Sequence, residues 1–431
     1  MTQSLFLQIH TLTSYAGVLL NRDDVGFAKR LPFGGAVRTR ISSQCLKRHW
    51  RSFDGDGSLA SIGPAMSVRS RRTFEEYVRK PLVAEGVPDV VAGAVTDELQ
   101  AVVLGAAPKR TGMASSGAEE EGALSDEGGG ESRTGQVTVL GRPEMDFVLG
   151  VARGIAQRCG SSPRKAKEAI KELLDHDGLA NLRAIRLGAG LDAALFGRMV
   201  TGDVLARCDA AIHVAHAFTV HEEAAENDYF AAVDDLVAAA GEETGSGHIG
   251  SNELTSGLFY GYVVIDVPLL VSNLEGCTRK DCPCRRAGQS SSRFVSNIEG
   301  CTRKDWRAAD RTLAAEIVRR FVRLVSTVSP GAKLGSTAPY AYAHLVGIES
   351  GSAQPCTLAN AFLRPIRSGA DVLDHAYRAL AGHAKDIDAM YGRETDRRFA
   401  GLETVQALGD AMGARLNMAD LAAWAGDRVS E

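Results

Sequence analysis

The sequence contains no long apolar run. A membrane-spanning helix needs a run of about 18 or more apolar residues. No segment of the sequence has such a run, although 45% of the 431 residues are apolar. The first residues lack a basic n-region, and Gln8, His10 and Thr11 interrupt their apolar stretch, so we expect no signal peptide. Eight cysteines, mostly scattered, in a large chain of this kind favour a reduced, cytoplasmic protein that does not bind a membrane.

The sequence also lacks a catalytic constellation. No Ser-His-Asp or Cys-His arrangement carries a supporting signature such as G-x-S-x-G. His213, His216 and His221 fall in one strand-like stretch. His213 and His221 share a face while His216 points opposite, so they do not converge as a metal triad, which favours structural roles. The G-x-G-x-x-G at 245–250 follows a helix-like segment and precedes a strand, the reverse of a dinucleotide-binding context. We therefore expect no enzymatic activity and no cofactor.

Positive charge is concentrated in residues 20–51. This basic segment holds eight cations and two acids, a local net charge of +6 in a chain whose formal net charge is −4. Gly34 and Gly35 allow a turn or a close backbone approach, and Ser42 and Gln44 add short polar side chains. Arg, Lys, Ser and Gln are residues that contact phosphate and sugar. The simplest partner is a polyanion that binds one face of the protein.

The residue periodicity predicts an α+β fold. Residues 5–10 alternate as in a half-buried strand, and 258–271 are rich in β-branched and aromatic residues, which is typical of strands. Residues 44–51 begin a helix with Ser42 or Ser43 as the N-cap. Helices are also expected over 73–104 with breaks at Pro81 and Pro88, over 144–186, over 230–241 and over 308–326. Strands separated by helices, with a large helical insertion, fit α+β rather than a doubly wound sheet.

Two regions interrupt this pattern. Residues 105–136 are rich in Gly, Ser and Glu with a net charge of −3, which predicts a disordered insert. VSNLEGCTRKD at 271–281 recurs as VSNIEGCTRKD at 295–305, which indicates a tandem duplication carried as an extra surface loop. The loop's cysteines could supply a zinc site, although their C-x4-C-x-C-x16-C spacing is not that of a standard zinc knuckle; they are Cys277, Cys282, Cys284 and Cys301. Many basic residues surround these cysteines, so a contact between the loop and a nucleic acid is the second alternative.

Short motifs in a fixed order carry a family resemblance. The basic segment contains LNRDD, FGG, RTRISSQ and LKR, and these are followed by GRM (197–199), AHAFTVH (215–221), FAAVDDL (230–236), GSGHIGSNELTSGLFY (245–260), PGAK (330–333) and LANAF (358–362). Together they resemble the backbone subunit of type I-E CRISPR Cascade, the CasC family of the RAMP superfamily. The resemblance covers most of the chain, but neither the insert at 105–136 nor the duplicated loop belongs to it.

The resemblance implies a scaffold that is not an enzyme. Copies would polymerise head to tail as a helical filament along a CRISPR RNA, together with other Cascade subunits, and present the guide for pairing with target DNA. Tyr229 and Phe230 would form a thumb wedge against bases, with core packing as the alternative. The positions that match RNA-contacting residues of the family are Arg22, Lys29, Ser42, Gln44, Lys47, Arg48, Met199 and Arg364.

The resemblance also implies a domain plan: an RRM-like (ferredoxin-like) palm with a helical fingers insertion and a protruding thumb. The N-terminal part of the palm covers 1–60, and the fingers cover 61–209 with the insert. A palm strand and the thumb cover 210–257. The C-terminal part of the palm covers 258–380 with the duplicated loop at 271–305, and a helical tail covers 381–431.

Two other interpretations stay open. Asp23 and Asp24 could chelate a metal in an RNA- or DNA-cleaving member of the same superfamily. Adjacent residues point apart in an extended backbone, however, so a structural role that pairs neighbouring arginines is favoured. The chain could also be a basic single-strand binder unrelated to CRISPR.

Overall fold

The computed structural model describes residues 5–104, 137–173, 182, 187–198, 208–232, 248–275, 306, 309–402 and 406–431. The chain divides into two compact units. The first comprises Met1–Ile62, Ile212–Val267 and Arg311–Glu431, and the second comprises Gly63–Ala211 and Pro268–Asp310. The insert at 105–136, Met199 and the four cysteines of the duplicated loop lie outside the described residues, so their predictions stay predictions.

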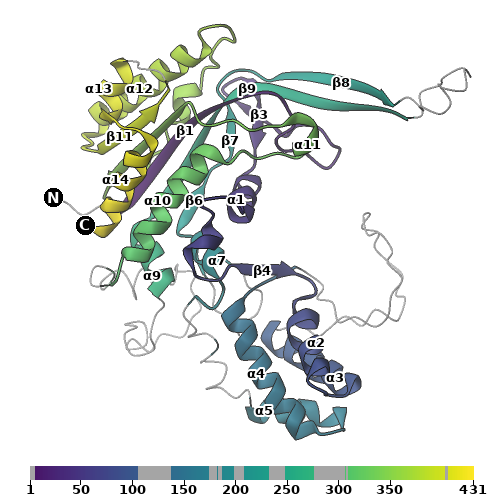
Figure 1. Cartoon of the computed structure of the whole chain (residues 1–431). Coiled ribbons are helices and arrows are strands. Elements are labelled where there is room, and N and C mark those ends of the chain that lie inside the picture. The colour runs from purple at the N-terminus through teal and green to yellow at the C-terminus, as the bar shows by residue number, and fades with distance from the viewer. Residues whose placement is uncertain are drawn as a thin grey trace, which may run out of the picture. The chain divides into compact units, whose positions relative to one another are not determined.

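A large, mostly antiparallel sheet organises the first unit (Figure 1). Its strands are β1 (Phe6–Val18), β2 (Arg30–Phe33), β3 (Ala36–Ile41), β6 (Ile212–Val214), β7 (Ala217–Thr219), β8 (Ala224–Ala232), β9 (His248–Asp266), β10 (Leu345–Gly351), β11 (Asp396–Gly401) and β12 (Ala414–Arg415). The order is β12-β11-β10-β1-β9-β7-β3-β2, and β6 and β8 also pair with β9. Among the strands that the structure describes, only the short β11–β12 pairing is parallel.

Helices cover both faces of this sheet. They are α1 (Ser43–Ser52), η1 (Leu59–Ile62), α10 (Thr312–Thr327), α11 (Leu334–Thr337), η6 (Ala359–Phe362), α12 (Val372–Tyr391), α13 (Gln406–Met412) and α14 (Met418–Ser430). On one face, Tyr377 of α12 packs in one apolar cluster with Leu12 of β1. On the other, Trp50 of α1 meets Phe321 of α10 edge to face, with ring centroids 5.4 Å apart.

The central strand β1 is buried on both sides. Leu7 and Ile9 on one face, and Gln8 and His10 on the other, are each at most 4% exposed. The prediction of a half-buried strand was therefore wrong, because alternation of apolar and polar residues does not reveal a second helical layer. The polar side chains of β1 must then find their partners inside the protein.

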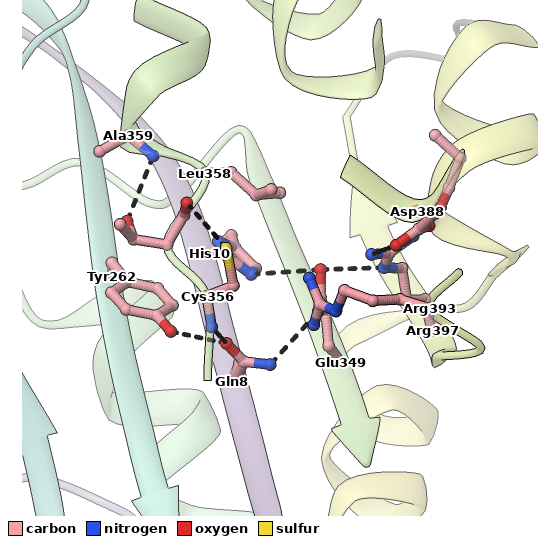
Figure 2. A network of polar contacts seen from close by, with 12 residues as sticks. Gln8, His10, Tyr262, Glu349, Cys356, Leu358, Ala359, Asp388, Arg393 and Arg397 are labelled. Atoms are coloured by element: carbon pink, nitrogen blue, oxygen red, sulfur yellow. Dashed lines mark hydrogen bonds and ion pairs between the residues drawn. The ribbon is translucent and has the colours of Figure 1, made fainter. Parts of the chain in front are cut away.

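A buried polar network supplies those partners (Figure 2). Gln8 Nε2 donates to Glu349 Oε2 at 3.3 Å, and His10 Nε2 lies 3.6 Å from Glu349 Oε1. Arg397 Nε donates to Glu349 Oε1 at 2.9 Å, and Arg393 Nη2 donates to Glu349 Oε2 at 3.3 Å. The fully buried carboxylate of Glu349 thus has two guanidinium partners, and the network links β1, β10, β11 and the segment that follows α12.

The protonation of His10 makes stability depend on pH. Burial lowers the pKa of His10 from 6.5 to about 4, mainly by desolvating its charged form, against the opposing attraction of Glu349. Because the unfolded chain binds this proton at higher pH than the folded one, the free energy of unfolding decreases as pH falls from about 6.5 towards 4. We expect a loss of roughly 2 kcal/mol between pH 7 and pH 5, measured by urea denaturation. His10→Asn should show a shallower dependence, and equal slopes would contradict this account.

Arg38 of β3 is completely buried and bonds only to carbonyl oxygens among the contacts that the structure records for it. Its guanidinium donates to Thr219 O at 2.9 Å, Phe362 O at 3.0 Å and Phe33 O at 3.3 Å. It therefore joins β3 to β7, to η6 and to the end of β2. This cation of the basic segment is structural, and solvent cannot reach it.

Replacing Arg38 tests this role. Arg38→Met removes the donors for three carbonyl groups, so we expect the free energy of unfolding to fall by about 2–4 kcal/mol in chemical denaturation. Arg367→Met is the matched control, because Arg367 is an exposed arginine of the same unit, and its effect should stay within about 0.5 kcal/mol. A similar, small effect of both variants would show that the buried guanidinium is dispensable.

The second unit is mainly helical. Its elements are β4 (Ser67–Ser70), η2 (Glu75–Arg79), α2 (Lys80–Ala84), α3 (Asp89–Leu104), β5 (Thr138–Gly141), α4 (Arg142–Cys159), η3 (Pro163–Lys165), α5 (Ala166–Leu173) and α7 (Leu191–Phe196), and most of α9 (Val267–Glu275). Val95 of α3 and Ile155 of α4 belong to its apolar core. A buried ion pair anchors the residue before Met199: Arg198 Nη1 and Nη2 bond the Glu144 carboxylate at 2.6 and 2.8 Å.

The α+β prediction is confirmed, and several predicted elements are present. Helix α1 begins after Ser42, whose side chain accepts the N–H of Cys45 as an N-cap does. The predicted helix at 308–326 corresponds to α10, and the break at Pro88 precedes α3. Pro81 lies instead within a continuous helical stretch, directly after the π-helical turn η2 and at the second residue of α2, so it does not break the helix there.

Other predicted elements were wrong. The strand at 258–271 ends at Asp266, and Val267–Glu275, which includes the start of the duplicated stretch, is helix α9. Phe230–Ala232, expected to begin a helix, belong to strand β8 because they pair with β9. The supposed helical tail at 381–431 contains β11, which joins the sheet through β10.

Candidate nucleic-acid interface

A capped loop precedes the sheet edge. Asp23 Oδ1 accepts the backbone N–H groups of Val25, Gly26 and Phe27 at 3.0, 2.8 and 2.9 Å. The structural role expected for Asp23 therefore holds, but its partners are backbone donors and not neighbouring arginines. Arg22 is exposed at the start of this loop, and no acid pairs with it among the described residues.

The hairpin between β2 and β3 explains the FGG motif. Gly34 and Gly35 have φ values of 64° and 81°, which favour glycine in a tight turn. A Cβ on Gly34 would lie only 1.6 Å from Leu363 O. The close approach expected of this motif is thus made to the protein's own backbone. It brings the exposed Arg364, which follows Leu363, to the tip of the hairpin.

Some cations of the basic segment are engaged within the fold. Arg30 donates to the carboxylates of Glu223 and Glu253, each at 2.5 Å, and the hydrogen bond that Glu253 accepts is the main cause that raises the pKa of Arg30. Arg40 Nε donates to Arg30 O at 3.1 Å. Together with the buried Arg38, these residues stabilise the sheet edge. They are less suited to hold a polyanion than the remaining cations.

The start of α1 forms a positive helix end. Ser42 is buried by its capping role, and Ser43 N donates to His216 Nδ1 at 3.0 Å. The first turn contains no acid, and the N–H of the exposed Gln44 has no acceptor among the described residues. Since the N–H groups of Ser43 and Cys45 are already bonded, the N–H of Gln44 and the helix dipole are what favour a bound anion at this end.

The cations beside α1 influence the pKa values of two neighbouring groups, Cys45 and His216. Burial raises the pKa of the Cys45 thiol to about 11, against the opposing influence of Arg48 and Lys29. Burial lowers the pKa of His216, and Arg40 and Lys29 lower it further. Lys29 and Arg48 therefore both act on the first turns of α1, and no acid pairs with either among the described residues. Lys47, on the same helix, is half-buried.

Tyr229 and Phe230 lie on a two-stranded ribbon formed by β8 and β9 (Figure 1). Tyr229 is 65% exposed and Phe230 is 39% exposed, so neither packs in the core. Adjacent strand residues point to opposite faces, which means that the two rings cannot grip one base together. A Cβ on Gly250 would lie 2.5 Å from Phe230 Cζ, so the Phe230 ring covers its cross-strand partner.

The loop after α10 adds contacts that sequence reasoning missed. Gly331 N donates to His49 Nε2 of α1 at 3.2 Å, and Lys333 Nζ bonds Asn252 Oδ1 of β9. The PGAK motif thus brings a cation between α1 and the middle of the β8–β9 ribbon. The lysine of this motif is the signal in the sequence that could have indicated the contact.

Metal sites and membrane spans are also absent from the described part of the chain. Among these residues, no three His, Cys, Asp or Glu side chains gather as metal ligands would. No described helix has the length and apolar character needed to cross a bilayer.

The comparisons with known proteins agree on the family. The profile of the CT1975-like protein family (Cas_CT1975) matches residues 7–424, so the chain belongs to this family. A chain of a solved "CRISPR RNA-guided surveillance complex, pre-nicking" is 25% identical, with a TM-score of 0.69 over 97% of this chain and 100% of that one. A chain of a solved "CRISPR RNA-guided surveillance complex" is 21% identical, with a TM-score of 0.60 and the same coverage, a likeness of fold. No curated protein matches the chain.

Charge removal tests the interface. We expect Lys29→Gln combined with Arg48→Gln to weaken binding of single-stranded RNA equally for all sequences, because phosphate contacts carry no sequence information. The slope of log affinity against log salt should become shallower by about 1.4, or roughly 0.7 per lost contact, in titrations by fluorescence anisotropy.

The matched control is Arg378→Gln combined with Lys385→Gln, which removes two exposed charges from α12. It should leave the salt slope unchanged. An equal effect of the two double variants, or a loss limited to certain RNA sequences, would contradict the assignment of Lys29 and Arg48.

Proposed function

We propose that this chain is the guide-RNA-binding backbone subunit of a CRISPR effector complex, of the type I-E Cascade (CasC) kind. Copies of it polymerise head to tail along the CRISPR RNA in the cytoplasm, beside other Cascade subunits, and present the guide to target DNA. Membership of the CT1975-like family supports this proposal, as does the likeness to a chain of an RNA-guided surveillance complex over 97% of the residues.

The observation that carries the proposal is the set of cations around α1. Arg22, Lys29 and Arg48 have no acid partner among the described residues, although the chain as a whole has an excess of acids. Leaving such charges unpaired costs little in water, and it retains a surface that attracts a polyanion. A subunit that must hold any guide sequence needs phosphate contacts of this type.

In this proposal the large sheet with its covering helices is the RRM-like palm. The β8–β9 ribbon is the thumb, and the helical second unit forms the fingers. The exposed Tyr229 on the ribbon is available to stack on a base, and stacking tolerates any base. We also propose that the chain is not an enzyme, and the three backbone donors on Asp23 Oδ1 support a structural role for that residue.

Co-purification tests the proposal directly. Tagged chain, expressed with a CRISPR array and the other subunits of its complex, should retain CRISPR RNA in several protein copies per guide. The variant with Lys29→Gln and Arg48→Gln should retain at least several-fold less RNA, because two phosphate contacts are lost. The α12 variant with Arg378→Gln and Lys385→Gln should retain as much RNA as the wild type. Recovery of unrelated RNA, or of one copy per guide, would contradict the proposal.

A cleavage assay tests the non-catalytic part. The purified complex is incubated with Mg²⁺ and labelled guide or target, and we expect both to stay intact. Cleavage by this chain that is lost in Asp24→Asn, while RNA binding is kept, would show that it is a nuclease.

A further inference from the structure

Two tyrosines stand out from the loop between α11 and β10. Tyr340 is 74% exposed and Tyr342 is 71% exposed, whereas Pro339 is buried and Ala341 is half-buried. This alternation shows that the two rings leave the same side of the segment. Large aromatic side chains rarely stay this exposed in pairs without a partner.

The backbone beneath the tyrosines is held firmly. Ser329 Oγ donates to Ala341 O at 2.9 Å and accepts the N–H of Ala341 at 3.0 Å. Ala343 N donates to Ser326 O at 2.8 Å. The exposure of the rings is therefore a property of an anchored segment, and an anchored platform loses little entropy when it binds.

The segment before α11 is attached to the candidate interface. Gly331 bonds His49 of α1, and Lys333 bonds Asn252 in the middle of the β8–β9 ribbon, beside α11 (Figure 1). All of these residues belong to the first unit. The tyrosines thus follow, after the short helix α11, the segment that contacts the two elements on which RNA contacts are proposed.

The charge of this region favours a nucleic acid over a protein partner. Residues 317–348 contain no Asp or Glu, although acids outnumber basic residues in the whole chain, and they include Lys333. Exposed aromatic rings on a segment that carries Lys333 and no acid of its own match the chemistry of single-strand binding sites.

We propose that Tyr340 and Tyr342 hold one unpaired base of the single-stranded guide between their rings. Two residues of extended chain span about 6.8 Å, and bases stack about 3.4 Å apart, so one base fits between the rings. The contact uses base faces and therefore accepts any sequence. This inference rests on the proposed function and adds a second kind of contact to the phosphate contacts of α1.

An abasic oligonucleotide separates stacking from phosphate binding. The full chain is titrated with a labelled single-stranded RNA long enough for one copy, and with the same RNA lacking its bases. Wild-type protein should bind the intact strand more than tenfold more tightly than the abasic one. Tyr340→Ala with Tyr342→Ala should weaken binding of the intact strand by about tenfold and reduce the preference to the part that Tyr229 supplies, while Tyr340→Phe with Tyr342→Phe keeps the wild-type affinity and preference.

Tyr391→Ala is the control, because Tyr391 is a 68% exposed tyrosine at the end of α12. It should bind like the wild type. If the double alanine variant binds RNA as tightly as the wild type, the tyrosine proposal is wrong while the proposed function stands. A loss of self-association with unchanged RNA affinity would have the same meaning and would indicate a protein contact. If the wild type binds neither RNA, the proposed function fails with it.

Discussion

The buried guanidinium of Arg38 holds the edge of the sheet together. Its three carbonyl acceptors belong to β2, β7 and η6, which are far apart in the sequence. With this group in place, the β2–β3 hairpin lies against the backbone of Leu363, and the chain enters β2 through Lys29. The hydrogen bonds of Arg38 thus help to fix the positions of Lys29 and Arg364, although Arg38 is itself buried and cannot contact a ligand.

The cations of the basic segment therefore fall into two groups with different roles. Arg30 pairs with carboxylates and Arg38 donates to carbonyl groups within the fold. Lys29 and Arg48, by contrast, have no acid partner among the described residues. A count of cations in the basic segment cannot separate these roles, because the acids concerned, Glu223 and Glu253, lie about two hundred residues away. The available positive surface is smaller than the net charge of the segment suggests, and it is more sharply located.

The sequence predicted local structure better than environment. The amphipathic spacing of α10 and the Ser42 cap of α1 depend on neighbours within a turn or two, so both were recognised. The double burial of β1 depends on two helical layers brought by distant segments, and alternation alone suggested one. Phe230 was assigned to a helix because its pairing with Gly250 lies across a hairpin.

The candidate site shows the same limit. Ser42 and Gln44 were expected together at an interface, but Ser42 is buried as a cap while Gln44 is exposed, since capping turns one hydroxyl inward. Lys333, and the two tyrosines that follow α11, are not predicted as contacts from the sequence, because only the fold brings the segment around Gly331 to α1. Which basic residues face a ligand is decided by tertiary contacts, and sequence spacing cannot supply them.

The most direct measurement is lysine footprinting of the chain with and without single-stranded RNA. Reactivity towards an acetylating reagent is read residue by residue by mass spectrometry, with Lys385, a half-exposed lysine that pairs with Asp410 on the far α12 segment, as the internal reference. The account predicts that RNA of any sequence protects Lys29 while Lys385 stays reactive. Equal reactivity of Lys29 in the free and RNA-bound protein would contradict it.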